Sequence, residues 1–134
     1  MDISHIEHIG IAVKSIENSL PYYEKVLGLK CYNIEEVVDQ KVKTAFFKVG
    51  QTKIELLEAA SEDSTIAKFI EKKGEGVHHI AFAVADVAEA LAEVEQKGVQ
   101  LIDKAPRGGA EGLNIGFLHP KSTGSVLTEF CDNK

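Results

Sequence analysis

An internal repeat constrains this chain more than any other feature of its sequence. Residues 6–13 recur at 77–84, at an offset of 71 residues, so that His8 falls on His79. Each of these apolar segments leads into a helical pattern that ends at a glycine. Repeats of this kind are copies of one supersecondary unit that together bury a core. Half of the chain, about 65 residues, would bury only a marginal core alone, so we predict that both copies form one domain.

Each copy is predicted to be a β-α-β-β-β module, which makes the fold class α+β. Ser15 or Asn18 can cap the first helix, with Pro21 in its first turn, and Asp86 with Glu89 forms a capping box for the second helix. A connector carries a further short helix over residues 65–73. In the single domain 1–134, the modules span about 5–60 and 76–132. Their predicted elements are strand 5–13, helix 16–27 and strands 29–36, 42–49 and 52–58, then strand 76–84, helix 87–97 and strands 99–103, 113–118 and 125–131, with a flexible loop over 104–112.

Composition and charge narrow the function classes. The chain is 44% hydrophobic and 27% charged, with a formal net charge of −6. An acidic chain is not a general nucleic-acid binder, which normally presents a basic face. We expect neither a leader nor a membrane segment, because no apolar run approaches 18 residues, and we therefore expect a cytoplasmic protein. In such a reducing compartment Cys31 and Cys131 are expected to be free thiols.

Two glutamates extend the repeat to the ends of the modules. Three extra residues around 119–122 change the offset from 71 to 74, which places Glu55 on Glu129. Each lies within an apolar strand, where a carboxylate is unfavourable to bury unless it is paired or bound to a cation. With the two histidines, this predicts a pseudo-symmetric His₂Glu₂ site that leaves positions open on a six-coordinate divalent ion.

Each of these residues also has a simpler interpretation. A lone strand histidine is usually structural, and Glu55 alone could be the solvated residue of a half-exposed strand. His78 is the weaker candidate of its pair, because the repeat maps it onto Glu7 and not onto His8. His119, beside a proline, is either a turn residue or part of a pocket. Four matched positions together favour the metal site.

The duplicated module with these four residues resembles the vicinal oxygen chelate superfamily, which includes glyoxalases, bleomycin resistance proteins and dioxygenases. Within it, the sequence is most similar to the methylmalonyl-CoA epimerases. The strand motifs are common to the superfamily, whereas the segments at 64–68 and 119–122 point to the epimerase branch. The similar segments are 8–13, 22–29, 54–58, 64–69, 76–82, 98–102 and 117–124.

The resemblance implies a U-shaped mixed sheet around a metal held by His8, Glu55, His79 and Glu129. Some members have glutamine at the position of Glu55, so a neutral oxygen ligand can serve there. Co²⁺ is the expected ion, with Ni²⁺, Mn²⁺, Zn²⁺ or Mg²⁺ as alternatives. A glutamate proposed as a catalytic base in some epimerases falls on Thr44 here, which leaves one base unidentified.

The implied reaction inverts the carbon between a thioester and a carboxylate in methylmalonyl-CoA. One group must remove its proton and another must return a proton to the opposite face. Glu129 is the first candidate, and its partner is Glu55, His119 or a water near Thr44. Contacts with the CoA phosphates or the substrate carboxylate are expected from His119, Lys121, Ser122 and Arg107, although a solvated loop also explains Arg107.

Other functions remain open at this stage. A glyoxalase I-type lactoylglutathione lyase would share the ligands and the proton abstraction, and a metal-free binding module would share the fold. Retention of all four ligands argues against the binding module, and a fourth ligand disfavours a ring-cleaving dioxygenase with its facial triad. The expected partners are an acyl-CoA substrate and a second copy of the chain in a homodimer.

Overall fold

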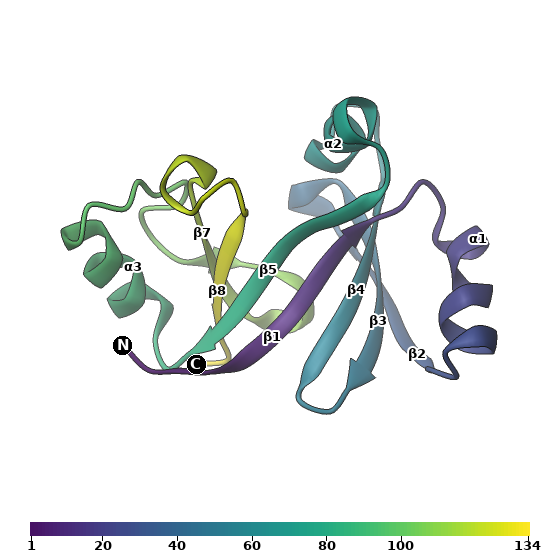
Figure 1. Ribbon diagram of the computed structural model, residues 1–134, viewed down its shortest axis with the longest axis horizontal. Helices are drawn as coiled ribbons and strands as arrows, with labels where there is room; N and C mark the ends of the chain where they lie inside the picture. Colours follow the sequence, from purple (N-terminus) through teal and green to yellow (C-terminus); the bar gives the residue numbers. More distant parts are fainter. The chain divides into compact units, whose positions relative to one another are not determined.

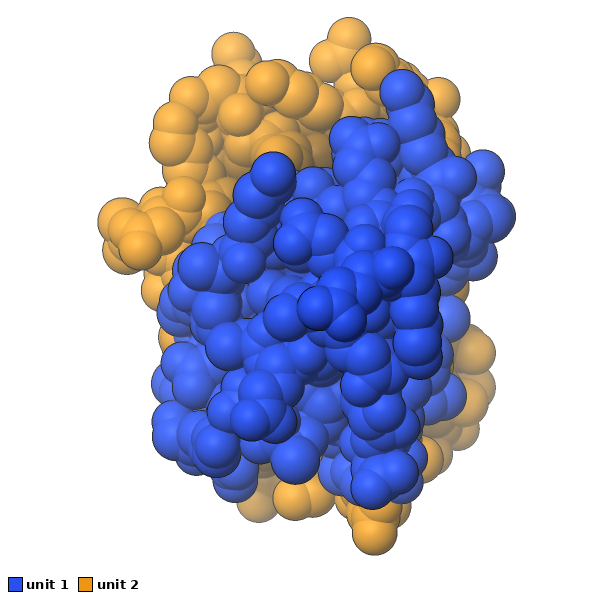
Figure 2. Space-filling view, turned by 90° about the vertical axis from the view of Figure 1, so that its left-hand side faces the viewer, with its two compact units in different colours: residues 1–8, 79–134 blue, residues 9–78 orange.

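The computed structural model describes residues 1–134 and divides into two compact units. Unit 1 comprises residues 1–8 and 79–134, and unit 2 comprises residues 9–78 (Figure 2). The first eight residues thus belong with the second copy of the repeat. One contact within unit 1 is the ion pair between the amino group of Met1 and Glu93, at 2.9 Å. None of the helices has the length and apolar character needed to span a bilayer.

Two strands, β1 (Ile3–Ala12) and β5 (Gly76–Val84), have residues in both units. Unit 2 otherwise contains α1 (Ile16–Pro21), η1 (Tyr22–Val26), β2 (Cys31–Val37), η2 (Val38–Gln40), β3 (Val42–Val49), β4 (Thr52–Ala59) and α2 (Thr65–Lys73). Unit 1 otherwise contains α3 (Val87–Gln96), β6 (Arg107–Gly108), η3 (Ala110–Gly112), β7 (Asn114–Leu118), η4 (Pro120–Ser122) and β8 (Thr128–Asp132).

In unit 2 the strand order is β2-β3-β4-β1, and β3 pairs antiparallel with both of its neighbours. Side chains alternate along a strand, and the apolar ones form a buried cluster on each face of the sheet. The first joins Val13, Ile16, Ala45, Phe47 and Leu56, so α1 begins within it. The second joins Ile66 of α2 to apolar residues of β1, β3 and β4.

In unit 1 the strand order is β1-β5-β8-β7-β6. Strand β8 runs parallel to β5 and antiparallel to β7, so the sheet is mixed, as predicted. Helix α3 lies beside β7 and β8 (Figure 1) and buries an apolar stripe against them. This cluster contains Val84, Val87, Ala90, Leu91, Val94, Leu101, Leu118 and Phe130.

In each unit a carboxylate on the last strand of the module accepts a hydrogen bond from a helix, α1 in unit 2 and α3 in unit 1. Glu58 accepts a hydrogen bond from the backbone N–H of Ile16 at 2.7 Å, and Asp132 accepts one from Val87 at 2.6 Å. Both donors are the first residues of their helices, whose N–H groups have no partner within the helix. The two carboxylates follow the same offset of 74 that relates the predicted glutamate ligands. The repeat therefore extends to a contact that sequence analysis did not predict.

The first helix differs from its prediction. Ser15, not Asn18, is the N-cap, and its side chain accepts the N–H of Asn18 at 3.1 Å. Pro21 is the last residue of α1 and not part of its first turn. Because proline has no N–H to donate, the regular pattern stops there. The helix then widens into the π-type turn Tyr22–Val26, which the bond from the N–H of Leu27 to the carbonyl of Tyr22 closes at 3.0 Å.

Residues 99–112 also differ from their prediction. The expected strand over 99–103 is reduced to a single bridge between Leu101 and Leu118. The expected flexible loop contains η3 and the short strand β6, which pairs with β7. Arg107 is thus part of the sheet edge and not of a solvated loop. Asp86 caps α3 as predicted, and its side chain accepts the N–H of Glu89 at 3.0 Å. The two cysteines are free, also as predicted.

Candidate metal centre

Three of the four predicted ligands lie together in unit 1, on three different strands. His8 is on β1, His79 on β5 and Glu129 on β8, and each is at most 6% exposed. Glu129 lies opposite Ala81 across the parallel pair β5 and β8. Residues 79 and 81 project to the same face of their strand. This register brings the Glu129 carboxylate to the face that carries the imidazole of His79.

The three side chains converge on one point through single atoms. The two Nε2 atoms of His8 and His79 are 2.9 Å apart, and Oε1 of Glu129 is 2.9 Å from the first and 3.1 Å from the second. The rings are perpendicular, with an interplanar angle of 89°. A second ring, that of Phe117, packs edge-on against His79 at a centroid distance of 5.5 Å.

The electrostatics of this cluster indicate that a positive charge belongs there. Oε1 of Glu129 is buried without a hydrogen-bond partner, although Nε2 of each histidine lies within 3.1 Å of it. Burial alone raises the pKa of the Glu129 carboxyl, but the adjacent His79 and His8 rings outweigh it and lower the pKa to about 2. A carboxylate that stays ionised in a buried site requires cationic compensation.

A divalent ion fits this arrangement. Adjacent donors around an octahedral ion with bonds of about 2.1 Å are separated by about 3.0 Å, and the three donor atoms are 2.9–3.1 Å apart. Two imidazoles and one carboxylate form a borderline donor set that suits several transition metals. His8, His79 and Glu129 are therefore a candidate metal centre, as their mutual spacing also indicates.

Family relationships agree with the fold and with this cluster. Residues 7–117 match the glyoxalase/bleomycin resistance protein/dioxygenase superfamily. The chain belongs to this superfamily. It is 46% identical to an uncharacterized protein of Bacillus subtilis over 98% of this chain and 94% of that protein. It is also 33% identical to human mitochondrial methylmalonyl-CoA epimerase, over 96% of this chain and 73% of that enzyme.

A solved structure extends the comparison. The crystallised methylmalonyl-CoA epimerase in complex with methylmalonyl-CoA and NH₄⁺ has a TM-score of 0.93 with this chain at 38% sequence identity. The match covers 97% of this chain and 94% of the epimerase. The glyoxalase-like fold that the sequence predicted for this superfamily member is thus confirmed.

Two predicted site residues of this superfamily member lie in unit 2. Glu55 on β4 is 4% exposed and lies opposite Phe46 on β3, and Thr44, also on β3, is 1% exposed. The burial of Glu55 excludes the solvated strand position that was its simpler interpretation. Its role as a ligand or base, and the role of Thr44, stay predictions.

The segment that pointed to the epimerase branch forms the turn η4. His119 is its N-cap, and its Nδ1 accepts the N–H of Lys121 at 3.1 Å. Oγ of Ser122 accepts the N–H of Gln100 at 2.9 Å, while Lys121 is exposed. His119 is therefore a turn residue, the first of its two alternatives, and a place in a pocket stays a prediction. The side chains of His119 and Ser122 fix the conformation of the turn.

Sequence analysis missed the residues that hold Arg107. Nε of Arg107 donates to Asp103 at 3.0 Å, and its guanidinium lies 5.6 Å from the centroid of the Phe117 ring. Asp103 also accepts the backbone N–H of Phe117 at 2.9 Å. Phe117 in turn contacts His79. The spacing of four residues between Asp103 and Arg107 was the available signal. The prediction of a strand over 99–103 and a flexible loop over 104–112 concealed it.

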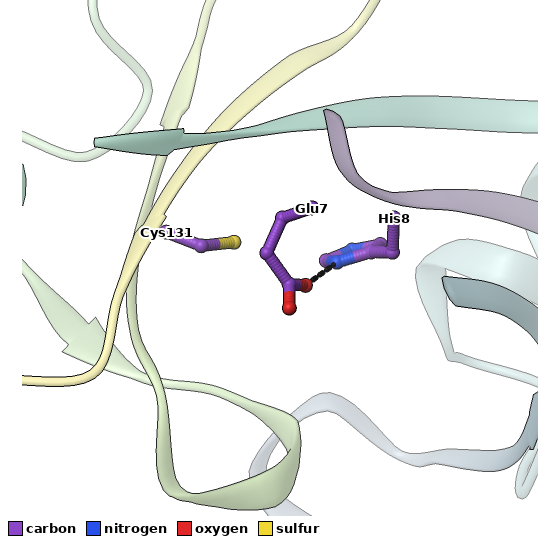
Figure 3. Close-up of side chains that lie close together, drawn as sticks. All are labelled: Glu7, His8 and Cys131. Carbon is purple, nitrogen blue, oxygen red and sulfur yellow. Dashed lines mark hydrogen bonds and ion pairs between the residues drawn. The ribbon is translucent and has the colours of Figure 1, made fainter. Parts of the chain in front are cut away.

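A second set of side chains surrounds the other nitrogen of His8. Oε1 of Glu7 lies 2.5 Å from Nδ1 of His8. Sγ of Cys131 is within 4.8 Å of both of these atoms (Figure 3). Burial raises the pKa of the Cys131 thiol to about 12. Nothing in the sequence except the adjacency of Glu7 to a predicted ligand suggested this group.

Proposed function

We propose that this chain is a metal-dependent epimerase of methylmalonyl-CoA. The observation that carries the proposal is the buried triangle of His8, His79 and Glu129, in which Oε1 of the carboxylate accepts no hydrogen bond. The relationship to methylmalonyl-CoA epimerases over nearly the whole chain supports the choice of substrate. The ion we expect is Co²⁺, with Ni²⁺, Mn²⁺, Zn²⁺ or Mg²⁺ as alternatives, and we include Glu55 as a fourth ligand.

A divalent ion in this site would act as a Lewis acid that stabilises negative charge on the thioester oxygen, a contribution of several kcal/mol. The protein contributes the geometry. His8 and His79 present their Nε2 atoms from two strands, and the packing of Phe117 against His79 restricts that ring. A site built on strands holds its groups more precisely than one built on loops.

Proton transfer requires groups on both faces of the substrate carbon, and positioned acid–base groups each contribute about 10²–10⁴-fold. Glu129 remains ionised at neutral pH because its pKa is lowered. Both a metal ligand and a proton acceptor must be ionised. Its partner is Glu55, His119 or a water held near Thr44. The turn at η4 leaves Nε2 of His119 available, because Nδ1 is the atom that caps Lys121.

The substrate is polyanionic, and this acidic chain must meet it with local cations. Lys121 is exposed on η4, and Arg107 is oriented by Asp103 with 43% of its side chain exposed. We expect Lys121→Ala to raise KM for the CoA thioester severalfold and to leave metal content unchanged, since a single exposed charge contributes up to about 1 kcal/mol. The charge-matched control is Lys97→Ala, which removes an exposed lysine at the C-cap of α3.

The decisive experiment measures α-proton exchange of methylmalonyl-CoA in D₂O with metal-loaded protein. Deuterium should appear at the α-carbon, and the His79→Ala protein should lose both the metal and the exchange. Absence of exchange together with conversion of the methylglyoxal–glutathione adduct to lactoylglutathione would assign the chain to the lyases instead. Absence of both reactions in protein that binds metal would refute the proposed activity and retain only the metal site.

A further inference from the structure

The carboxylate of Glu7 is placed to control the metal ligand next to it in the sequence. Its Oε1 lies 2.5 Å from Nδ1 of His8, and the Glu7 side chain is 15% exposed while that of His8 is 6% exposed. Neighbouring residues of a strand project to opposite faces. Glu7 therefore reaches the ring through its two methylene groups, and its carboxylate faces the imidazole directly (Figure 3).

This contact determines which ring nitrogen of His8 can bind a metal. A neutral imidazole carries one proton, and a carboxylate at Nδ1 retains that proton as an N–H donor. The lone pair is then on Nε2, the atom that converges with His79 and Glu129. A carboxylate in this position also makes the imidazole a stronger donor to the ion.

The second histidine of the repeat has a different environment. The residue before His79 is His78, which falls on Glu7 by the offset of 71. The His78 ring packs edge-on against Phe69 at 5.0 Å, whereas the His79 ring packs against Phe117. The contact from the preceding residue is therefore specific to the first copy, because position 78 carries an imidazole where position 7 carries a carboxylate.

We propose that Glu7 is a positioning residue for the metal centre, which fixes the Nδ1–H tautomer of His8 and strengthens its Nε2 as a ligand. The inference rests on the proposed metal site but not on the identity of the substrate. Loss of a carboxylate behind a metal-bound histidine typically lowers metal affinity by about 10–100-fold. Cys131, whose Sγ lies within 4.8 Å of a carboxylate oxygen of Glu7, has no ligand role in this proposal.

The test compares the unchanged protein with Glu7→Leu, which removes the acceptor, and Glu7→Gln, which keeps a carbonyl acceptor but no charge. Titration calorimetry should show that Glu7→Leu raises the dissociation constant for Co²⁺ by about 10–100-fold and that Glu7→Gln raises it less. The ¹⁵N NMR chemical shifts of the imidazole nitrogens in the metal-free protein should identify the Nδ1–H tautomer of His8. Only Glu7→Leu should increase the population of the Nε2–H tautomer. His78→Gln is the matched control and should change neither quantity.

Several results would overturn the inference. Equal Co²⁺ affinity in all proteins, with an unchanged His8 tautomer, would make Glu7 a surface residue of the strand. Two ions per chain, one of which is lost in Cys131→Ser, would mean that Glu7, His8 and Cys131 bind a metal of their own. If the unchanged protein binds no Co²⁺, the metal site itself is refuted and the positioning role with it, whereas failure of the epimerase assay alone leaves this inference intact.

Discussion

In each unit a phenylalanine lies directly opposite a buried glutamate on an antiparallel neighbour. Phe46 lies opposite Glu55 in unit 2, and Phe117 lies opposite Glu129 in unit 1. A cation also lies near each ring, with Nζ of Lys53 at 6.0 Å from Phe46 and the guanidinium of Arg107 at 5.6 Å from Phe117. The repeat has thus preserved strand register and not only residue type.

The partners of the two glutamates differ. Glu129 has two imidazoles at 2.9 and 3.1 Å. Glu55 lies two residues after Lys53, on the same face of β4, and Lys53 is itself buried at 8% exposed. The equivalent carboxylates therefore differ in the ionisable side chains that share their face of the sheet within their own units. Burial of a carboxylate identifies a site that needs a cation, but it does not distinguish a metal from a lysine.

The largest expected effect separates these two glutamates. We expect Glu129→Gln to weaken Co²⁺ binding by more than about 100-fold, beyond the usual effect of a residue behind the ligands. Glu55→Gln should weaken it less than about tenfold, because Glu55 is not among the three side chains whose donor atoms converge at 2.9–3.1 Å. Metal content after dialysis measures both. Equal losses would mean that the two copies contribute equally, and no loss in Glu129→Gln would refute the centre.

One pair of equivalent positions shows that the two sheets leave different space for a side chain. Gly116 on β7 corresponds to Ala45 on β3, which is fully buried in its cluster. A Cβ at Gly116 would lie 2.8 Å from Cδ1 of Leu91, a residue that is 1% exposed. Unit 1 has room only for glycine where unit 2 accommodates alanine.

Exchange of these two residues should therefore be asymmetric. Gly116→Ala is expected to lower the free energy of unfolding by about 1–3 kcal/mol, the usual effect of overpacking. Ala45→Gly should lower it by about 1 kcal/mol, because it adds backbone freedom and removes one buried methyl group. Urea denaturation measures both. Combining Gly116→Ala with Leu91→Ala should give less than the sum of the single effects, and strict additivity would show that the two positions do not interact.

The smallest effect concerns the carboxylates that hold the helices. Asp132 is buried, which raises the pKa of its carboxyl, but the bonds from the Val87 N–H, the Asn114 side chain and the Lys134 N–H outweigh burial and lower it. A depressed pKa adds stability above the unfolded value of about 3.9, and this stability is lost as the pH falls through the folded value.

Asp132→Asn should therefore be less stable than the unchanged protein by about 1–2 kcal/mol at pH 7, because the amide keeps one acceptor oxygen but loses the charge that strengthens these hydrogen bonds. The difference should shrink below about pH 4, where the unchanged protein loses its advantage. Thermal unfolding at a series of pH values checks this. Glu58→Gln, the equivalent change in unit 2, serves as the comparison, and a pH-independent difference for Asp132→Asn would contradict the argument.

Much of the molecule could be predicted from its sequence. The repeat and its periodicity predicted the modules, with β3, β4 and α2 at the expected positions. These features are local, because strand alternation, helical periodicity and capping depend on residues a few positions apart. The same reasoning predicted a set of four ligands, of which His8, His79 and Glu129 lie together. Where a local rule was misapplied, as at Pro21, the error stayed within one helix.

Only the tertiary structure decided which groups meet. It placed residues 1–8 in the unit of the second copy, so that His8 lies with His79 and Glu129. It also brought Asp103 to the backbone N–H of Phe117 and the Phe117 ring to His79, through contacts that no periodicity encodes. Such contacts depend on the pairing of strands and on the packing of side chains between distant segments. The sequence specified the chemical groups and their strands, and the folded chain alone set the 2.9 Å distances that allow a metal to be bound.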